Sequence, residues 1–161
     1  MLEYYGALQA VGAQKKPKQN IKQDLQKKPV EKANLYCRNP KWNFRQADKE
    51  KWSIFDFFTQ SNANGKKTIE SLRSFEGMTW REIVQASGGK ASGHGTNSHY
   101  IPVDQLCRDA QKRLNDLRIQ EDEIFSLRLT GTHRLWGIIE ADGVFRILWY
   151  DPDHTIYPLD K

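Results

Sequence analysis

The chain has 161 residues, of which 38% are hydrophobic, 28% charged and 11% aromatic. This size allows one folded domain with a modest apolar core, and no apolar run approaches the roughly 20 residues of a transmembrane helix. The formal net charge of +5 favours partners that carry phosphates, although net charge does not determine a fold.

The first residues lack the basic start and apolar stretch of a secretory signal. Cys37 and Cys107 form no disulfide framework. We therefore expect a reduced, cytoplasmic protein with no membrane association.

The amino-terminal part of the chain is rich in lysine. Seven lysines and two prolines lie within Lys15–Lys32, with few large apolar side chains to bury. This composition predicts a basic extension over residues 1–33 and a folded domain over residues 34–161. The extension is either a solvated spacer or an arm that touches nucleic acid or a partner protein.

The stretch Asn34–Glu50 mixes aromatic and basic side chains, among them Tyr36, Trp42 and Phe44. These rings can stack on bases while basic neighbours meet phosphates, or they can pack on the domain, and the sequence leaves both interpretations open. Trp52–Thr59 alternates enough to predict a strand.

The middle of the chain has helical periodicity. A turn over Ser61–Lys67 is followed by apolar residues at spacings of three from Thr68, which predicts a helix. Thr79 begins a second helix, because Glu82 three residues later completes a capping box. After a glycine-rich loop, the apolar residues of Val103–Leu117 share one face and predict a third helix.

The end of the chain predicts an antiparallel sheet. Alternation with period two places Leu127 inward and Arg128 outward, and Asp142-Gly143 is a hairpin signal. The expected strands are Ile124–Thr130, His133–Ala141, Val144–Asp151 and His154–Tyr157. The preceding helices can cover the apolar face, which gives an α+β fold with a small antiparallel sheet and helices packed on one face.

Residues 126–157, S-L-R-L-T-G-T-H-R-L-W-G-I-I-E-A-D-G-V-F-R-I-L-W-Y-D-P-D-H-T-I-Y, resemble the RelE/ParE toxin superfamily. The similarity lies in an L-R segment, a G-x-x-R-L segment, a hairpin, a hydrophobic strand, a histidine and a late tyrosine. It covers these strands well and the middle of the chain only in outline. The resemblance implies a RelE-like fold and a toxin-type ribonuclease that cuts messenger RNA, often on the ribosome, without a metal.

The positions that match the family are Arg134, His154 and Tyr157, and Arg128 is expected on the exposed side of the same sheet. The chain departs from the family in its length, in an amino-terminal third without a counterpart, and in Trp136. Asp151 and Asp153 also place carboxylates near the expected site, where they would repel phosphate and put a nuclease role in doubt.

RNA cleavage by its own 2′-hydroxyl needs a base, a cation for the phosphorane charge and an acid for the leaving oxygen. His154 suits either proton-transfer role because its reference pKa lies near 6.5. Tyr157 can position a group or donate a proton. The candidate bases are Glu140, Asp151 and Asp153, and the candidate cations are Arg128, Arg134 and Arg146.

The other residues expected to contact RNA are Lys90, His99, Arg146 and Trp136. The histidines and cysteines have neither HExxH nor CxxC spacing, so we expect no metal and no cofactor. The expected partners are RNA, on the ribosome or off it, and a cognate antitoxin. The alternatives are a non-catalytic RelE-fold module that binds nucleic acid or a protein partner, and a purely protein-interacting role.

Overall fold

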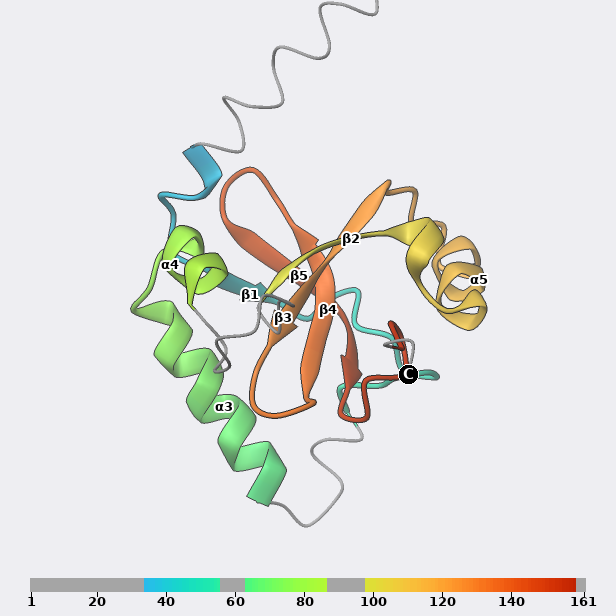
Figure 1. Ribbon diagram of the computed structural model, residues 1–161, viewed down its shortest axis with the longest axis horizontal. Coiled ribbons are helices and arrows are strands. Elements are labelled where there is room, and N and C mark those ends of the chain that lie inside the picture. Colours follow the sequence, from blue (N-terminus) through green and yellow to red (C-terminus); the bar gives the residue numbers. More distant parts are fainter. Residues whose placement is uncertain (1–33, 56–62, 87–97, 159–161) are drawn as a thin grey trace, which may run out of the picture.

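The computed structural model describes residues 34–55, 63–86 and 98–158, and it has an α+β fold built on a five-stranded sheet (Figure 1). The strand order is β1-β5-β4-β3-β2. Strands β2 to β5 pair antiparallel, whereas β1 runs parallel to β5, so the sheet is mixed. The strands are β1 (Lys41–Asn43), β2 (His99–Pro102), β3 (Glu123–Arg128), β4 (Arg134–Ile139) and β5 (Val144–Asp151).

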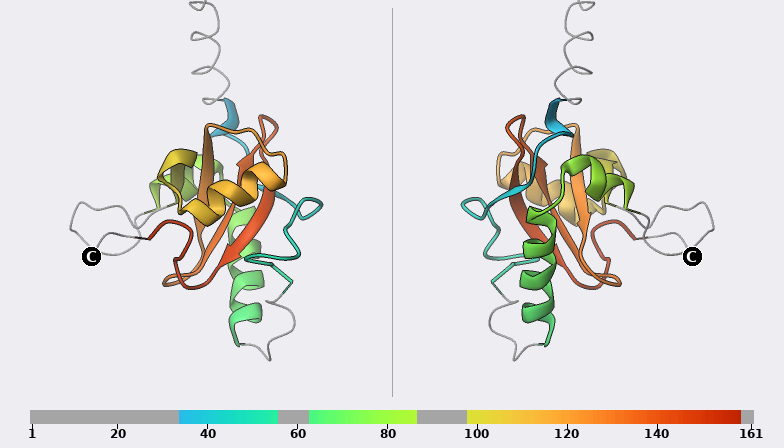
Figure 2. Two further views of the ribbon diagram at one scale, coloured as in Figure 1. Left: turned by 90° about the vertical axis from the view of Figure 1, so that its right-hand side faces the viewer. Right: turned by 90° about the vertical axis from the view of Figure 1, so that its left-hand side faces the viewer.

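Helices cover both faces of this sheet, as Figure 2 shows. On one face lie α3 (Ala63–Glu76) and α4 (Trp80–Gln85), and on the other lies α5 (Arg108–Asp116), which follows the short 3-10 helix η1 (Val103–Gln105). The expectation of helices on one face is therefore wrong. The physical reason is that the strands carry large apolar side chains on both sides, and each side needs a cover.

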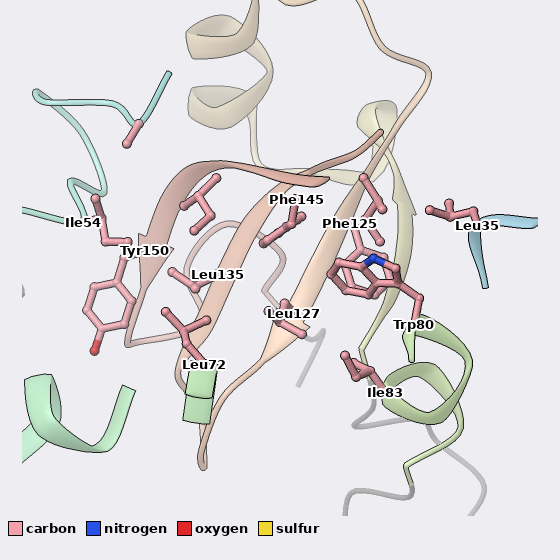
Figure 3. Packing of buried hydrophobic residues seen from close by; sticks show 13 residues of the cluster. Leu35, Ile54, Leu72, Trp80, Ile83, Phe125, Leu127, Leu135, Phe145 and Tyr150 are labelled. Atoms are coloured by element: carbon pink, nitrogen blue, oxygen red, sulfur yellow. The ribbon is translucent and has the colours of Figure 1, made fainter. Parts of the chain in front are cut away.

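The first core lies between the sheet and helices α3 and α4 (Figure 3). Trp80 is fully buried in it, with its ring centroid 5.6 Å from that of Phe125 and 5.8 Å from that of Phe145 in edge-to-face geometry. The predicted capping box positions this tryptophan: Glu82 N–H donates to Thr79 Oγ1, and Thr79 N–H donates to the Glu82 carboxylate. The indole Nε1–H of Trp80 donates to the Gly143 carbonyl, so its one polar atom is satisfied.

The second core lies between the sheet and α5, and a buried ion pair crosses its edge. Its buried members are Ile101, Leu106, Ala110, Leu114, Ile124, Trp136, Leu148, Trp149 and Ile156. The Asp48 carboxylate accepts from Arg113 of α5 at 2.5 and 2.7 Å and from the Trp149 indole at 3.1 Å. These bonds fasten the chain after β1 to both the helix and the sheet.

Several element boundaries differ from the sequence predictions. Trp52–Phe55, the described part of the expected strand Trp52–Thr59, is a turn in which Trp52 has a φ of +48°. Helix α3 starts at Ala63, within the expected turn, and the expected helix Val103–Leu117 is interrupted before α5 at Leu106 and Cys107. Strands β1 and β2 were not expected, because their few residues become strands only through their neighbours.

The three carboxyl-terminal strands β3, β4 and β5 confirm the predicted antiparallel run. The Asp142-Gly143 turn is also confirmed. Gly143 N–H donates to the Glu140 carbonyl, and Gly143 has a φ of +90°, which glycine adopts without steric cost. The basic extension, residues 1–33, lies outside the described residues. Within the ranges described, every helix is too short or too polar to cross a lipid bilayer.

Gly137 lies beside an irregularity in the β4–β5 pairing, where the register shifts between Trp136 and Gly137. A Cβ at this position would overlap the backbone carbonyl of Arg146 and approach Phe145 Cε2 to 3.0 Å. We expect Gly137→Ala to lower the free energy of unfolding by about 1–3 kcal/mol, measured by urea denaturation.

The control for this substitution is Gly77→Ala, whose Cβ would meet only Ser74 O at 3.6 Å. Stability there should stay unchanged or rise by up to about 1 kcal/mol. Equal effects at both glycines would contradict a steric requirement at Gly137.

Candidate functional site

Two turns meet at one end of the sheet and form the candidate site. The first joins β3 to β4, and its tip holds Gly131, which has a φ of +55°. The second follows β5 and spans residues 151–157. Thr132 Oγ1 donates to the Pro152 carbonyl at 2.6 Å, which ties the two turns together.

Asp151 organises the second turn from inside. Its carboxylate is fully buried and accepts from Thr155 N–H at 3.0 Å, from Thr155 Oγ1–H at 3.1 Å and from Ile156 N–H at 2.9 Å. Ile156 is fully buried in the second core, and its carbonyl accepts from Cys107 N–H at the start of α5. The expected strand His154–Tyr157 is therefore wrong, since its backbone bonds to a side chain and to a helix end rather than to a neighbouring strand.

This turn fixes the orientation of His154. The residue has a φ of +61°, and its Nδ1 lies 2.9 Å from the Tyr157 carbonyl oxygen. A carbonyl only accepts hydrogen bonds, so Nδ1 carries the proton and the lone pair of the neutral ring is on Nε2. Tyr157 is half-buried against the second core.

Arg128 and Arg134 are direct register partners on adjacent strands, so both side chains leave the same face of the sheet. Arg134 is only 5% exposed, and its Nη1 is buried with no hydrogen-bond partner in the described part of the chain. Burial and then the Arg128 charge lower the pKa of Arg134 to about 10, against the opposing effect of Asp151. At neutral pH Arg134 is still a cation.

Among residues 34–55, 63–86 and 98–158, no carboxylate forms an ion pair with Arg134. Asp151 is its register partner, but both carboxylate oxygens of Asp151 are engaged by the turn. A buried cation that forms no ion pair is costly, and an incoming anion would relieve that cost. The arrangement is suited chemically to holding a phosphate or another oxyanion.

Other expected site residues lie apart from this end of the sheet. Trp136 is fully buried in the second core, so the prediction that its ring contacts RNA is wrong; helix α5 covers the face on which it was expected to be open. Arg146 lies on β5 and pairs with Ile138, which is four residues beyond Arg134 on β4, a distance of about 13 Å. It lies 3.4 Å from Glu121 and 3.6 Å from Glu140, which compensate its charge.

Two further residues, His99 and Lys90, were also expected to contact RNA. His99 is half-buried on β2, opposite Ser126 of β3. Lys90 lies outside the described residues. The structure therefore brings Arg128, Arg134, His154 and Tyr157 to one end of the sheet. Side-chain alternation in the sequence did not predict this arrangement, because it leaves the strand register open.

Sequence reasoning missed a second polar pair at this end. His133 Nδ1 lies 2.6 Å from the Tyr150 hydroxyl. The sequence predicts His133 as the start of a strand, without the spacing of a metal ligand, and Tyr150 as part of the strand Val144–Asp151. The only signal in the sequence is a histidine placed directly after a turn and before an arginine.

In comparisons with known proteins, no family model, curated protein or solved structure matches this chain.

Proposed function

We propose that the chain is a toxin-type, metal-independent endoribonuclease of the RelE-like class, acting on RNA in the cytoplasm and restrained by a cognate antitoxin. The observation that carries the proposal is the Arg128–Arg134 pair, in which a buried guanidinium nitrogen of Arg134 has no partner among the described residues. Further support comes from the sequence resemblance in β3 to β5 and from the position of His154 in the adjoining turn.

Two neighbouring guanidiniums suit the transition state of RNA cleavage. The phosphorane carries more negative charge than the phosphodiester, so cations already in place stabilise it preferentially. Because Arg134 is removed from water, its interaction with that charge is stronger than at an exposed site.

His154 is the general base of the proposed reaction. Its Nδ1–H is held by the Tyr157 carbonyl, so Nε2 is the atom that accepts the 2′-hydroxyl proton. The same bond holds the ring in one orientation, so less conformational entropy is lost when the transition state is reached.

A non-catalytic module that binds nucleic acid is the second candidate function, and one observation favours it. Two of the three carboxylates expected as bases are occupied: Asp151 by its turn and Glu140 by Arg146, at the far end of the sheet. A module without catalysis needs the arginine pair but no proton-transfer group.

The arginine pair gives a direct test of RNA binding. We expect Arg128→Gln and Arg134→Met each to weaken binding of a dye-labelled single-stranded RNA by about 10- to 100-fold, the value of one charged hydrogen bond. Fluorescence anisotropy over a salt series should also show a slope smaller by about 0.7 for each phosphate that the variant no longer neutralises.

The matched control is Arg146→Gln, on the same face of the sheet but compensated by Glu121 and Glu140. Its RNA affinity should equal that of the wild type. Equal losses in all three variants would indicate only a general effect of net charge and would count against this site. Cleavage assays with and without translating ribosomes, in EDTA, then separate the nuclease from the binding module.

A further inference from the structure

The His133–Tyr150 pair lies at the same end of the sheet as the guanidinium that is proposed to bind phosphate. His133 directly precedes Arg134, and its ring centroid is 5.8 Å from that of Tyr150. Tyr150 is buried on β5 against the first core, and its hydroxyl is directed away from the apolar side chains there (Figure 3). His133 is half-buried and directly precedes β4. Its bond to Tyr150 places its ring on the side of the first core, whereas the side chain of Arg134 leaves the opposite face at the same end of the sheet.

The two histidines lie on adjoining turns. The hydrogen bond from Thr132 Oγ1 to the Pro152 carbonyl joins the turns, with His133 one residue after Thr132 and His154 two residues after Pro152. Register pairing of Arg134 with Asp151 places both turns at the same end of the sheet. Both histidines therefore belong to turns at the end of the sheet where Arg134 begins β4.

Cleavage through the 2′-hydroxyl requires an acid as well as a base, and His154 supplies only one of them. We propose that His133 is the general acid that protonates the leaving 5′-oxygen, and that Tyr150 is the residue that positions its ring. This inference rests on the proposed endoribonuclease function and adds to it the second proton-transfer group.

The Tyr150 hydroxyl can accept the hydrogen bond that the proposed acid requires. Burial, with smaller contributions from Asp153 and Asp151, raises the pKa of Tyr150, so the phenol keeps its proton at neutral pH. In the proposed acid form, the His133 ring donates Nδ1–H to the phenol oxygen, and Nε2–H is then the proton to be transferred.

The atoms of the reaction balance without a further reactant. His154 Nε2 takes the 2′-hydroxyl proton, the 2′-oxygen bonds to phosphorus, and the bond from phosphorus to the 5′-oxygen breaks. His133 gives its Nε2 proton to that oxygen, which leaves a 2′,3′-cyclic phosphate and a 5′-hydroxyl. Exchange with water then returns both histidines to their starting states.

A change of leaving group tests the acid role. At the mapped cleavage position of an RNA, the bridging 5′-oxygen is replaced with sulfur, whose thiolate leaves without protonation. We expect His133→Asn, in the full-length chain, to slow cleavage of the oxygen-linked RNA by at least about 100-fold and that of the sulfur-linked RNA hardly at all. His154→Asn should slow both, because the base is needed for either leaving group.

Two further variants complete the design. Tyr150→Phe keeps the ring but removes the hydroxyl, so it should slow only the oxygen-linked RNA, and by less than His133→Asn. Asp116→Asn, which alters an exposed carboxylate at the end of α5, should leave both rates unchanged.

Wild-type rates for His133→Asn on the oxygen-linked RNA, or equal slowing of both RNAs by this variant, would each overturn the role of His133 while the nuclease function remained. A wild-type chain that cleaves no RNA, with or without translating ribosomes, would overturn both proposals.

Discussion

Replacing Asp48 with alanine should lower the free energy of unfolding by about 3–5 kcal/mol, the cost of breaking a buried ion pair from one side. The Asp48 carboxylate is fully buried. It accepts from Arg113, from the Trp149 indole and from the backbone N–H of Glu50 and Lys51. Its removal leaves a buried indole donor without an acceptor, and urea denaturation measures the loss.

The control is Asp109→Ala, which breaks the exposed ion pair between Lys51 and Asp109. Exposed pairs contribute about 0–1 kcal/mol, so a loss comparable to that of Asp48→Ala would contradict the importance assigned to burial.

The free energy of unfolding measured as a function of acidic pH provides a second test of the role of Asp48. Burial alone raises the pKa of this carboxyl, but the hydrogen bonds from Arg113, Glu50, Trp149 and Lys51 outweigh burial and lower it to about 2. Because the folded-state pKa is below the unfolded value, ionised Asp48 contributes roughly 2 kcal/mol to the free energy of unfolding above about pH 4. This contribution is lost as the pH falls toward 2. In Asp48→Asn this part of the acid dependence should disappear.

Replacing His154 with asparagine should reduce RNA cleavage by about 100- to 10,000-fold and leave RNA binding unchanged, because the general base is lost while the arginine pair remains. Asparagine tolerates the left-handed backbone of this position, and its amide N–H can still donate to the Tyr157 carbonyl. The variant thus removes the titratable nitrogen with little disturbance of the turn. Gel analysis of cleavage products, together with induced expression in growing cells, measures the effect.

Unchanged cleavage in a folded His154→Asn variant would remove the proposed base and, with it, the mechanism. Cleavage lost together with RNA binding would show instead that His154 helps to hold the RNA. Relief of growth arrest without any change in cleavage would point to a target other than RNA.

The carboxyl-terminal strands and the Thr79 cap were predictable because their signals are local. Period-two alternation and the Asp142-Gly143 turn depend on neighbours in sequence, and so does the Thr79–Glu82 capping box. The short strands β1 and β2 were not predictable, since three or four residues carry little periodicity and depend on pairing with β5 and β3.

The candidate site was predictable in composition but not in geometry. The resemblance singled out Arg134, His154 and Tyr157, yet Trp136, which is buried, and Arg146, which is paired at the far end of the sheet, were also expected to contact RNA. Alternation identifies which residues share a face along one strand. It does not identify what covers that face or which strand end a distant residue meets.

By itself the sequence determined an α+β chain ending in three antiparallel strands, because hydrophobic period and turn chemistry are properties of short segments. Only the tertiary structure decided that α5 covers the second face, that Asp48 meets Arg113 across 65 positions, and that His133 meets Tyr150. These contacts join residues distant in sequence, and their energies arise from burial and register, which exist only once the chain has folded.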